Sequence, residues 1–326
     1  MEPIKLKHVE ECGQASAAGV KAFVDARYGI TAHWGLYSLN GRGEWVYFVE
    51  RIPYEKYRER LAQFNPKRFC AEEWADLMLE TGAKFFLITT KHHEGFCLWD
   101  SDLTDFKVTN SAFKRDIIAE LAPALADRGI GFHYYYSLVD WTHPAYRNDW
   151  DAYVAYYQRQ LRELLTRYGK IGGIVFDGYW PRSNITEGVE YFRAGGDWDL
   201  TGTYKLIHEL QPDAVVANNT HVLPFKGEDY QVWELDLPGE NTIGFNTTDI
   251  GTLPRVAWWN LNRGWSYAPR THAVKSADEI LGVMARARAK EAVFFLNVGP
   301  RPFGDIHPDE QAVLREIGKK RRVYQL

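Results

Sequence analysis

The sequence is short of several features that mark particular classes of protein. Its 326 residues include three cysteines, 39 Lys+Arg against 43 Asp+Glu, and no apolar run as long as a membrane-spanning helix needs. Cys12, Cys70 and Cys97 fit neither a paired disulfide framework nor a zinc motif. These absences argue against a disulfide-stapled secreted domain, a membrane protein and a nucleic-acid-binding protein.

Targeting and linker signals are also missing. Residues 1–14 contain no apolar stretch of the kind found in secretory signals, so we expect a reducing, cytoplasmic location. No linker, low-complexity tract or charge run divides the chain, which predicts one domain over residues 1–326. Aromatic residues, by contrast, are plentiful, with 12 Trp, 19 Tyr and 17 Phe. Flat aromatic side chains suit a ligand with C–H faces, such as a sugar.

Short apolar runs alternate with helix-period stretches along nearly the whole chain. The runs are Gly29–His33, Lys84–Thr90, Gly131–Tyr136, Gly173–Phe176, Ala214–Ala217, Tyr230–Trp233, Arg255–Trp258 and Ala292–Leu296. Their uniform apolar character is typical of parallel strands buried on both faces. About eight strand–helix repeats predict a (β/α)8 barrel of the TIM type. A doubly wound sheet is the alternative, but no glycine-rich phosphate-binding motif follows any strand.

Local signals place several boundaries. Gly82 is expected to end one helix, Ser276 and Glu279 form a capping-box pattern at the start of another, and the last helix is expected to run from Pro308 to Gly318. Two connections, residues 34–71 and 178–198, are longer than the rest, and long segments in a compact domain are usually functional. The first is rich in Trp and Tyr, so we interpret it as a wall of the binding site.

Polar and aromatic residues follow the predicted strands, at the ends that meet in the mouth of a barrel. They are His33, Trp34, His92, His93, Glu94, Tyr135, Tyr136, Ser137, Asp177, Asn218, Asn219, Glu234, Trp258 and Trp259. Asp177 is either a catalytic carboxylate or a helix N-cap, and Glu234 is either catalytic or a solvated loop residue. A carboxylate pair in an aromatic mouth is the arrangement that glycoside hydrolysis needs.

The histidines allow more than one interpretation. His92 and His93 lack partners at metal-ligand spacing, so hydrogen bonding to a polar substrate is the expectation, with no metal and no other cofactor. His33 is either a satisfied core histidine or a site residue. No nucleophile-elbow serine or Cys/His signature supports acyl-enzyme hydrolysis.

Several motifs, in order, resemble the α-L-fucosidases of glycoside hydrolase family twenty-nine. They are Tyr28-Gly-Ile-Thr-Ala-His-Trp-Gly-Leu-Tyr-Ser, Gly43-Glu-Trp, Thr89-Thr-Lys-His-His-Glu-Gly-Phe-Cys-Leu-Trp-Asp-Ser, Tyr135-Tyr-Ser, Asp140-Trp, Phe176-Asp-Gly, Leu296-Asn-Val-Gly-Pro and Gly304-Asp-Ile. The resemblance covers about Tyr28 to Gly318. It implies a retaining exo-enzyme that removes terminal α-L-fucose from glycans through a covalent fucosyl-enzyme.

The resemblance also implies roles for single residues. Asp177 takes the position of the nucleophile. The substrate-binding positions fall on His33, Glu44, Trp45, His92, His93, Tyr135 and Trp265, the last beside the sugar's methyl group. For the acid/base, the family pattern runs from an Asn-containing strand end through an Asp-aromatic pair to a Glu five residues after that Asp. Asn218-Asn219, Asp229-Tyr230 and Glu234 follow it, with Glu228 and Glu240 in reserve.

The same resemblance sets the domain expectation, and two other functions stay open. The chain stops soon after the predicted barrel, so we expect no C-terminal β-domain of the kind many members carry. The expected partner is a fucosylated oligosaccharide or glycoconjugate, with no nucleic acid and no membrane. The alternatives are an inactive barrel that binds fucosylated glycans as a lectin, and a hydrolase acting on another sugar or depending on a metal. Linkage preference and oligomeric state are not predicted.

Overall fold

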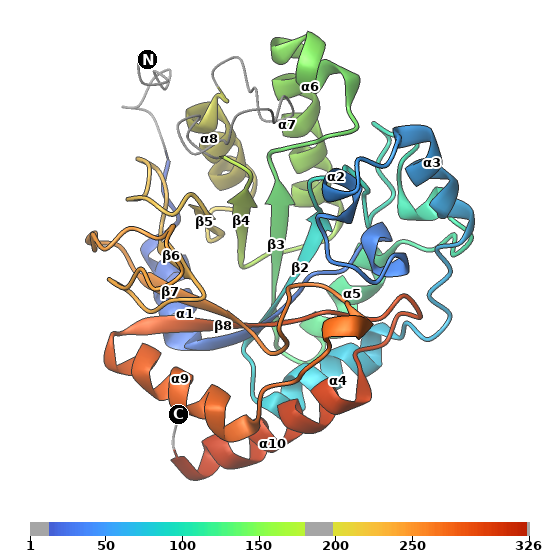
Figure 1. The fold of residues 1–326 in the computed structure, drawn as a ribbon. Helices are drawn as coiled ribbons and strands as arrows, with labels where there is room; N and C mark the ends of the chain where they lie inside the picture. The colour runs from blue at the N-terminus through green and yellow to red at the C-terminus, as the bar shows by residue number, and fades with distance from the viewer. Residues whose placement is uncertain (1–12, 180–197, 325–326) are drawn as a thin grey trace.

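Eight parallel strands form one sheet that curls into a nearly closed barrel, which confirms the predicted fold (Figure 1). The structure is a computed structural model that describes residues 13–179 and 198–324. The strands are β1 Tyr28–Ala32, β2 Phe85–Lys91, β3 Gly131–Ser137, β4 Gly173–Asp177, β5 Val215–Asn218, β6 Gln231–Glu234, β7 Arg255–Asn260 and β8 Ala292–Val298. Their order in the sheet is β5-β4-β3-β2-β1-β8-β7-β6.

Helices follow most of the strands. The helices are α1 Ala17–Ala26, α2 Val46–Val49, α3 Tyr54–Arg58, α4 Ala71–Thr81, α5 Ile117–Ala126, α6 Pro144–Asn148, α7 Trp150–Arg167, α8 Leu200–Leu210, α9 Ala277–Ala289 and α10 Pro308–Tyr324. The chain differs from eight regular repeats at β5 and β6, which are followed by no α-helix but by residues 219–230 and 235–254, all of them described. Both loops begin at the mouth of the barrel, and the second returns along β6, where the Thr247 and Asp249 carbonyl oxygens accept hydrogen bonds from the Trp233 and Gln231 side chains.

The gap in the barrel lies between β5 and β6, the two ends of the sheet order. Asp229 spans it with backbone and side chain. Its N–H donates to the Val216 carbonyl oxygen over 2.7 Å, and its Oδ2 accepts the Val216 N–H over 2.8 Å. Oδ1 accepts the backbone N–H of Ala15 over 3.0 Å. One buried carboxylate therefore joins the two sides where no ladder does.

Two of the three helix-end predictions are confirmed, and one is wrong. Gly82 ends α4 in the left-handed region, with φ 76°. Ser276 and Glu279 form the capping box of α9. The last helix, however, runs through Gly318 to Tyr324. A Cβ at Gly318 would lie 2.0 Å from the Glu80 carbonyl oxygen, so this glycine allows α10 to pack closely on α4 rather than ending the helix.

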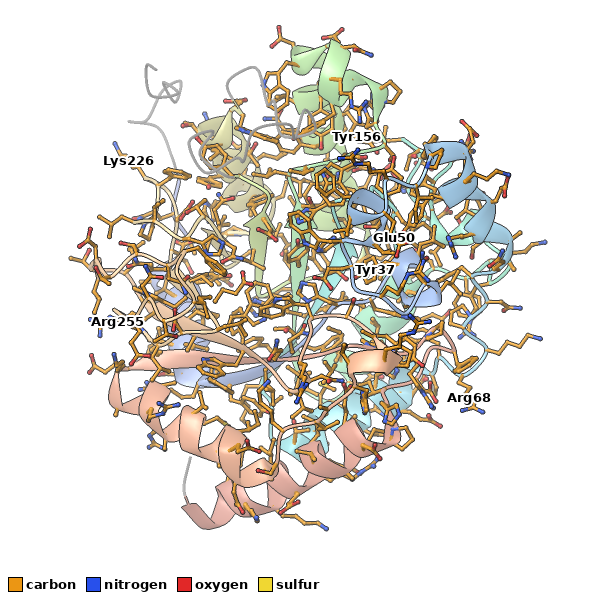
Figure 2. All side chains as sticks on the ribbon, viewed as in Figure 1. Tyr37, Glu50, Arg68, Tyr156, Lys226 and Arg255 are labelled. Atoms are coloured by element: carbon orange, nitrogen blue, oxygen red, sulfur yellow. The ribbon has the colours of Figure 1, made fainter. Side chains whose placement is uncertain are left out.

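The interior consists of two apolar clusters, and both contain many aromatic side chains. Figure 2 shows side chains filling the space around the sheet, with Tyr37 inside the molecule and Arg68 and Lys226 at its outer edge. Tyr37 belongs to the long connection 34–71, which folds as short helices against the barrel. Most of the other long connection, residues 180–197, lies outside the described residues.

Cys70 and Cys97 are free cysteines, and Cys12 also lies outside the described residues. Within the described ranges, no helix combines the length and apolar character that crossing a membrane demands. The cytoplasmic location and the extent of the domain stay predictions.

Candidate active site

Asp177 is the last residue of β4 and faces the mouth of the barrel. Its Oδ2 accepts a hydrogen bond from the Tyr135 hydroxyl over 2.7 Å, and its Oδ1 accepts the Gly178 N–H over 2.8 Å. Burial raises the pKa of Asp177 to about 6, against these hydrogen bonds, which favour the charged form. Asp177 does not cap the next helix, since Asp199 is the N-cap of α8. Asp177 is thus ionised near pH 7 and oriented by two donors.

Glu234 is the last residue of β6. Its Oε2 accepts a hydrogen bond from Asn219 Nδ2 over 2.7 Å. Burial and the negative charge of Asp177 together raise the pKa of Glu234 to about 8. The Asn219 side chain also lowers the pKa of Asp177, so one amide acts on both carboxyl groups. Between pH 6 and pH 8 the pair therefore holds one ionised and one protonated carboxyl, the condition for nucleophile and general acid.

The two reserve candidates for the acid/base are engaged elsewhere. Glu228 accepts hydrogen bonds from the Tyr204 hydroxyl over 2.9 Å and from Asn218 Nδ2 over 3.0 Å, between α8 and the end of β5. Glu240 forms an ion pair with Lys290 at 3.3 Å. Glu234, by contrast, lies close enough to Asp177 for the charge of Asp177 to raise its pKa.

Three buried histidines face the same mouth, and burial lowers the pKa of each, so they are neutral near pH 7. His33 Nδ1 lies 2.7 Å from Asn297 Oδ1, and His93 Nδ1 lies 2.6 Å from Ser137 Oγ. Asn297 Oδ1 can only accept, and Ser137 donates its proton to the Val139 carbonyl oxygen. This network assigns the protons of His33 and His93 to Nδ1, so that Nε2 is the acceptor nitrogen of each ring.

His92 and His93 pack directly on the residues that surround Asp177. Their rings are 4.1 Å apart, and His92 stacks on Tyr135 at 5.4 Å with an interplanar angle of 4°. His93 Nε2 lies 3.7 Å from Asp177 Oδ2. A sugar hydroxyl beside Asp177 would thus meet an acceptor nitrogen.

Aromatic side chains close the mouth on two sides. Trp45 lies edge-on to His93 at 5.4 Å. The Trp265 ring lies 5.2 Å from that of His33, and the Trp265 side chain acts against burial by lowering the pKa of Glu234. Glu44 Oε2 accepts a hydrogen bond from Ser266 over 2.8 Å, and the charge of Glu44 acts on both Asp177 and Glu234. The structure therefore brings together all nine candidate site residues, although their roles stay predictions.

Four residues of the site had no role assigned from the sequence: Ser137, Asn219, His221 and Asn297. Ser137 and Asn219 stand at predicted strand ends and Asn297 within a family motif, but nothing in those patterns shows which histidine or carboxyl each would bind. His221 stands apart from every motif. It lies in the loop after β5, with Nε2 4.0 Å from Glu234 Oε2.

Among the described residues, His92 and His93 belong to no group of three side chains that could hold a metal ion. The one such group there is His272, His307 and Asp309. Those ligand atoms lie within 4.8 Å of one another. His272 and His307 belong to the loops after β7 and β8, and Asp309 to the first turn of α10, away from the Asp177 pair. That the reaction needs no metal stays a prediction.

Comparison with known proteins matches the chain to one family. The alpha-L-fucosidase family model matches residues 8–324. Alpha-L-fucosidase 1 of Arabidopsis thaliana is 30% identical over 281 residues, covering 78% of this chain and 52% of that protein. Plasma alpha-L-fucosidase of Homo sapiens is 35% identical over 322 residues, covering 91% and 66%. The chain thus spans about half to two thirds of the length of these relatives.

Solved structures agree in fold. Alpha-L-fucosidase isoenzyme 1 from Paenibacillus thiaminolyticus superposes with a TM-score of 0.81 at 34% identity, covering 93% of this chain and 75% of that one. A Bacteroides thetaiotaomicron alpha-L-fucosidase, trapped as a covalent intermediate with 2-fluoro-fucosyl fluoride, gives 0.82 at 29% identity, covering 100% and 79%. On the match over nearly its whole length, the chain belongs to the alpha-L-fucosidase family.

Proposed function

We propose that this protein is a retaining exo-α-L-fucosidase acting on fucosylated oligosaccharides or glycoconjugates. The observation that carries the proposal is the buried carboxyl pair Asp177 and Glu234, at the ends of β4 and β6, which holds opposite protonation states between pH 6 and pH 8 because the charge of Asp177 raises the pKa of Glu234. The covalent intermediate of the Bacteroides relative supports the same course of reaction.

In the first step, an Asp177 carboxylate oxygen attacks the anomeric carbon of fucose while Glu234 donates its proton to the glycosidic oxygen. The bond to the leaving sugar breaks, and a fucosyl-Asp177 ester forms. In the second step Glu234, now ionised, takes a proton from water, and that water displaces Asp177 from the anomeric carbon. Two displacements return the α-anomer.

The sugar itself would be held by the histidine wall. His33 and His93 each present Nε2 as a hydrogen-bond acceptor, and the Tyr135 hydroxyl fixes the attacking carboxylate. Trp265 lies against His33 at the other side of the mouth, where an apolar contact with the C6 methyl group would favour fucose over sugars that carry a hydroxyl there.

The test is hydrolysis of aryl α-L-fucoside, β-D-galactoside and α-L-arabinoside, each with and without EDTA. We expect hydrolysis of the fucoside, unchanged by EDTA, and α-fucose as the first product in the NMR spectrum. Binding of fucose without hydrolysis of any substrate would indicate a lectin instead. Preference for another sugar, or loss of activity in EDTA, would also overturn the proposal.

A further inference from the structure

Large apolar side chains are exposed on the loops that follow β5 and β6. The exposed large apolar residues in the described part of the chain are Val49, Leu79, Val222, Leu223, Phe245, Ile250 and Phe303. Four of these seven come from the two loops that follow β5 and β6, the strands that carry Asn219 and Glu234 at their ends. Exposed apolar surface gathered beside a polar site marks a surface that binds something.

The Phe245 ring, 46% exposed, is held in place rather than carried on a free loop tip. Its neighbour Asn246 is buried and bonds to both main-chain groups of Glu234. Asn246 Oδ1 accepts the Glu234 N–H over 3.3 Å, and Asn246 Nδ2 donates to the Glu234 carbonyl oxygen over 2.8 Å. The Thr247 N–H donates to the His221 carbonyl oxygen over 2.8 Å, which ties the two loops together. The exposed ring thus has a fixed position relative to the catalytic candidate.

His221 connects this ring to Glu234. The His221 and Phe245 rings are 4.4 Å apart, and His221 Nε2 lies 4.0 Å from Glu234 Oε2. His221 Nδ1 lies 3.3 Å from Asn246 Oδ1, an acceptor, so Nδ1 carries the proton and Nε2 has a free lone pair. Burial lowers the pKa of His221 to about 4, so the ring is neutral at pH 7. A neutral acceptor nitrogen therefore stands between Glu234 and an exposed aromatic face.

We propose that His221 and Phe245 form the subsite for the leaving group, and that its occupant is a pyranose sugar, the residue whose oxygen is bonded to fucose. This inference rests on the proposed function. A general acid must touch the glycosidic oxygen, so whatever packs beside Glu234 meets the sugar beyond that oxygen.

The placement of the two walls supports this occupant. His33, His92, His93 and Tyr135, from β1 to β3, surround Asp177, whereas His221 and Phe245 follow β5 and β6. The C–H face of a pyranose packs on an aromatic ring, and a ring hydroxyl can donate to His221 Nε2. Both interactions are absent for a leaving group that is a single atom.

The experiment compares kcat/KM for a fucosylated disaccharide with kcat/KM for α-L-fucosyl fluoride, whose leaving group is one fluoride ion. In Phe245→Ala the ratio of the two should fall about 3- to 10-fold, the range expected for loss of one aromatic contact. Phe245→Tyr, which keeps the ring, should restore the ratio. Phe303→Ala is the matched control, because Phe303 is 52% exposed and lies against Arg68 and Arg301 in the loop after β8.

The outcomes separate the subsite from the proposed function. If the unaltered protein hydrolyses neither substrate, the proposed function has failed. If it hydrolyses both, a fall of the ratio in Phe245→Ala alone supports the subsite. A ratio that does not move, or moves equally in Phe303→Ala, overturns it. The subsite is also overturned if Phe245→Ala lowers kcat/KM, relative to fucosyl fluoride, for a nitrophenyl fucoside but not for the disaccharide. The Phe245 ring would then accept aryl groups rather than a sugar.

Discussion

The two walls of the mouth are built in different ways. On the histidine side, β1 pairs with β2 over four residue pairs and with β8 over five, so the ladders fix where His33 and His92 stand. On the Glu234 side, β5 pairs with β4 and β6 with β7 over four residue pairs each, but no ladder joins β5 to β6, and both end in loops without helices. The positions of these loops depend on side chains, with Asp229 across the gap and Asn246 on the main chain of Glu234.

This difference separates two kinds of recognition. A sheet ladder cannot shift at one residue without disturbing its neighbours, so the histidine side suits a sugar that is the same in every substrate. A loop held by a few amide hydrogen bonds can change its residues without disturbing the barrel. The Glu234 side therefore suits a leaving group that varies. Substitutions on the two sides should have different substrate dependence.

The largest loss of activity is expected at Asp177, which lies between the two walls. Asp177→Gly should lower the hydrolysis of every fucoside by about 10³-fold or more, since no other group can form the ester. The fold should remain, because burial disfavours the ionised carboxylate and its removal leaves only a small cavity. Hydrolysis rates and thermal unfolding check both parts. Activity of Asp177→Gly within tenfold of the unaltered protein would contradict the assignment. Release of β-fucose as the first product of the unaltered protein would also contradict it.

Glu234→Gln should come next, with an effect that depends on the leaving group. Loss of a general acid costs about 10²- to 10⁴-fold in kcat/KM where the leaving group needs protonation, as in oligosaccharides. A nitrophenyl fucoside should lose much less in kcat/KM, because its aryloxide leaves unaided. Its kcat should fall more, since the same residue must later act as base. Equal losses in kcat/KM on both substrates would contradict the role.

A smaller loss is expected on the histidine side. His93→Ala removes one buried acceptor and should lower kcat/KM about 5- to 150-fold. Because fucose is common to all substrates, the loss should be equal for the disaccharide and for fucosyl fluoride. Ser137→Ala, which removes only the group that orients His93 Nδ1, should have a smaller effect of the same kind. A loss confined to the disaccharide would place His93 on the leaving-group side and break the comparison.

The sequence predicted the strands well because each is an apolar run buried on both sides. It predicted the positions of Asp177 and the histidines because parallel strand ends converge. It did not predict the shortened connections at β5 and β6, since no local signal distinguishes a loop from a short helix there. Nor did it assign Asn219 or His221, whose roles depend on contacts with residues distant in the chain. The error at Gly318 has the same origin, because that glycine serves a contact with Glu80.

The smallest effect is a change of kcat/KM with pH, about tenfold per pH unit, as Asp177 and Glu234 gain or lose protons. Asp177 must be ionised, and its pKa is raised to about 6 by burial, so kcat/KM should fall as the pH drops below 6. Glu234 must be protonated, and its pKa is raised to about 8 by burial and by Asp177, so kcat/KM should fall again above pH 8. The expected profile for an oligosaccharide is a bell centred near pH 7.

The alkaline limb of that bell decides between two buried glutamates on the Glu234 side, because burial also raises the pKa of Glu228 to about 8. Measured with the oligosaccharide, the residual kcat/KM of Glu234→Gln should lack the alkaline limb and keep the acid limb, since Glu234 is neutral near pH 6. Glu228→Gln, the matched variant, should keep both limbs, because Glu228 bonds to Tyr204 and Asn218 rather than to the pair. If Glu228→Gln loses the alkaline limb and Glu234→Gln keeps it, the group that titrates near pH 8 is Glu228. The protonation assigned to Glu234 is then wrong.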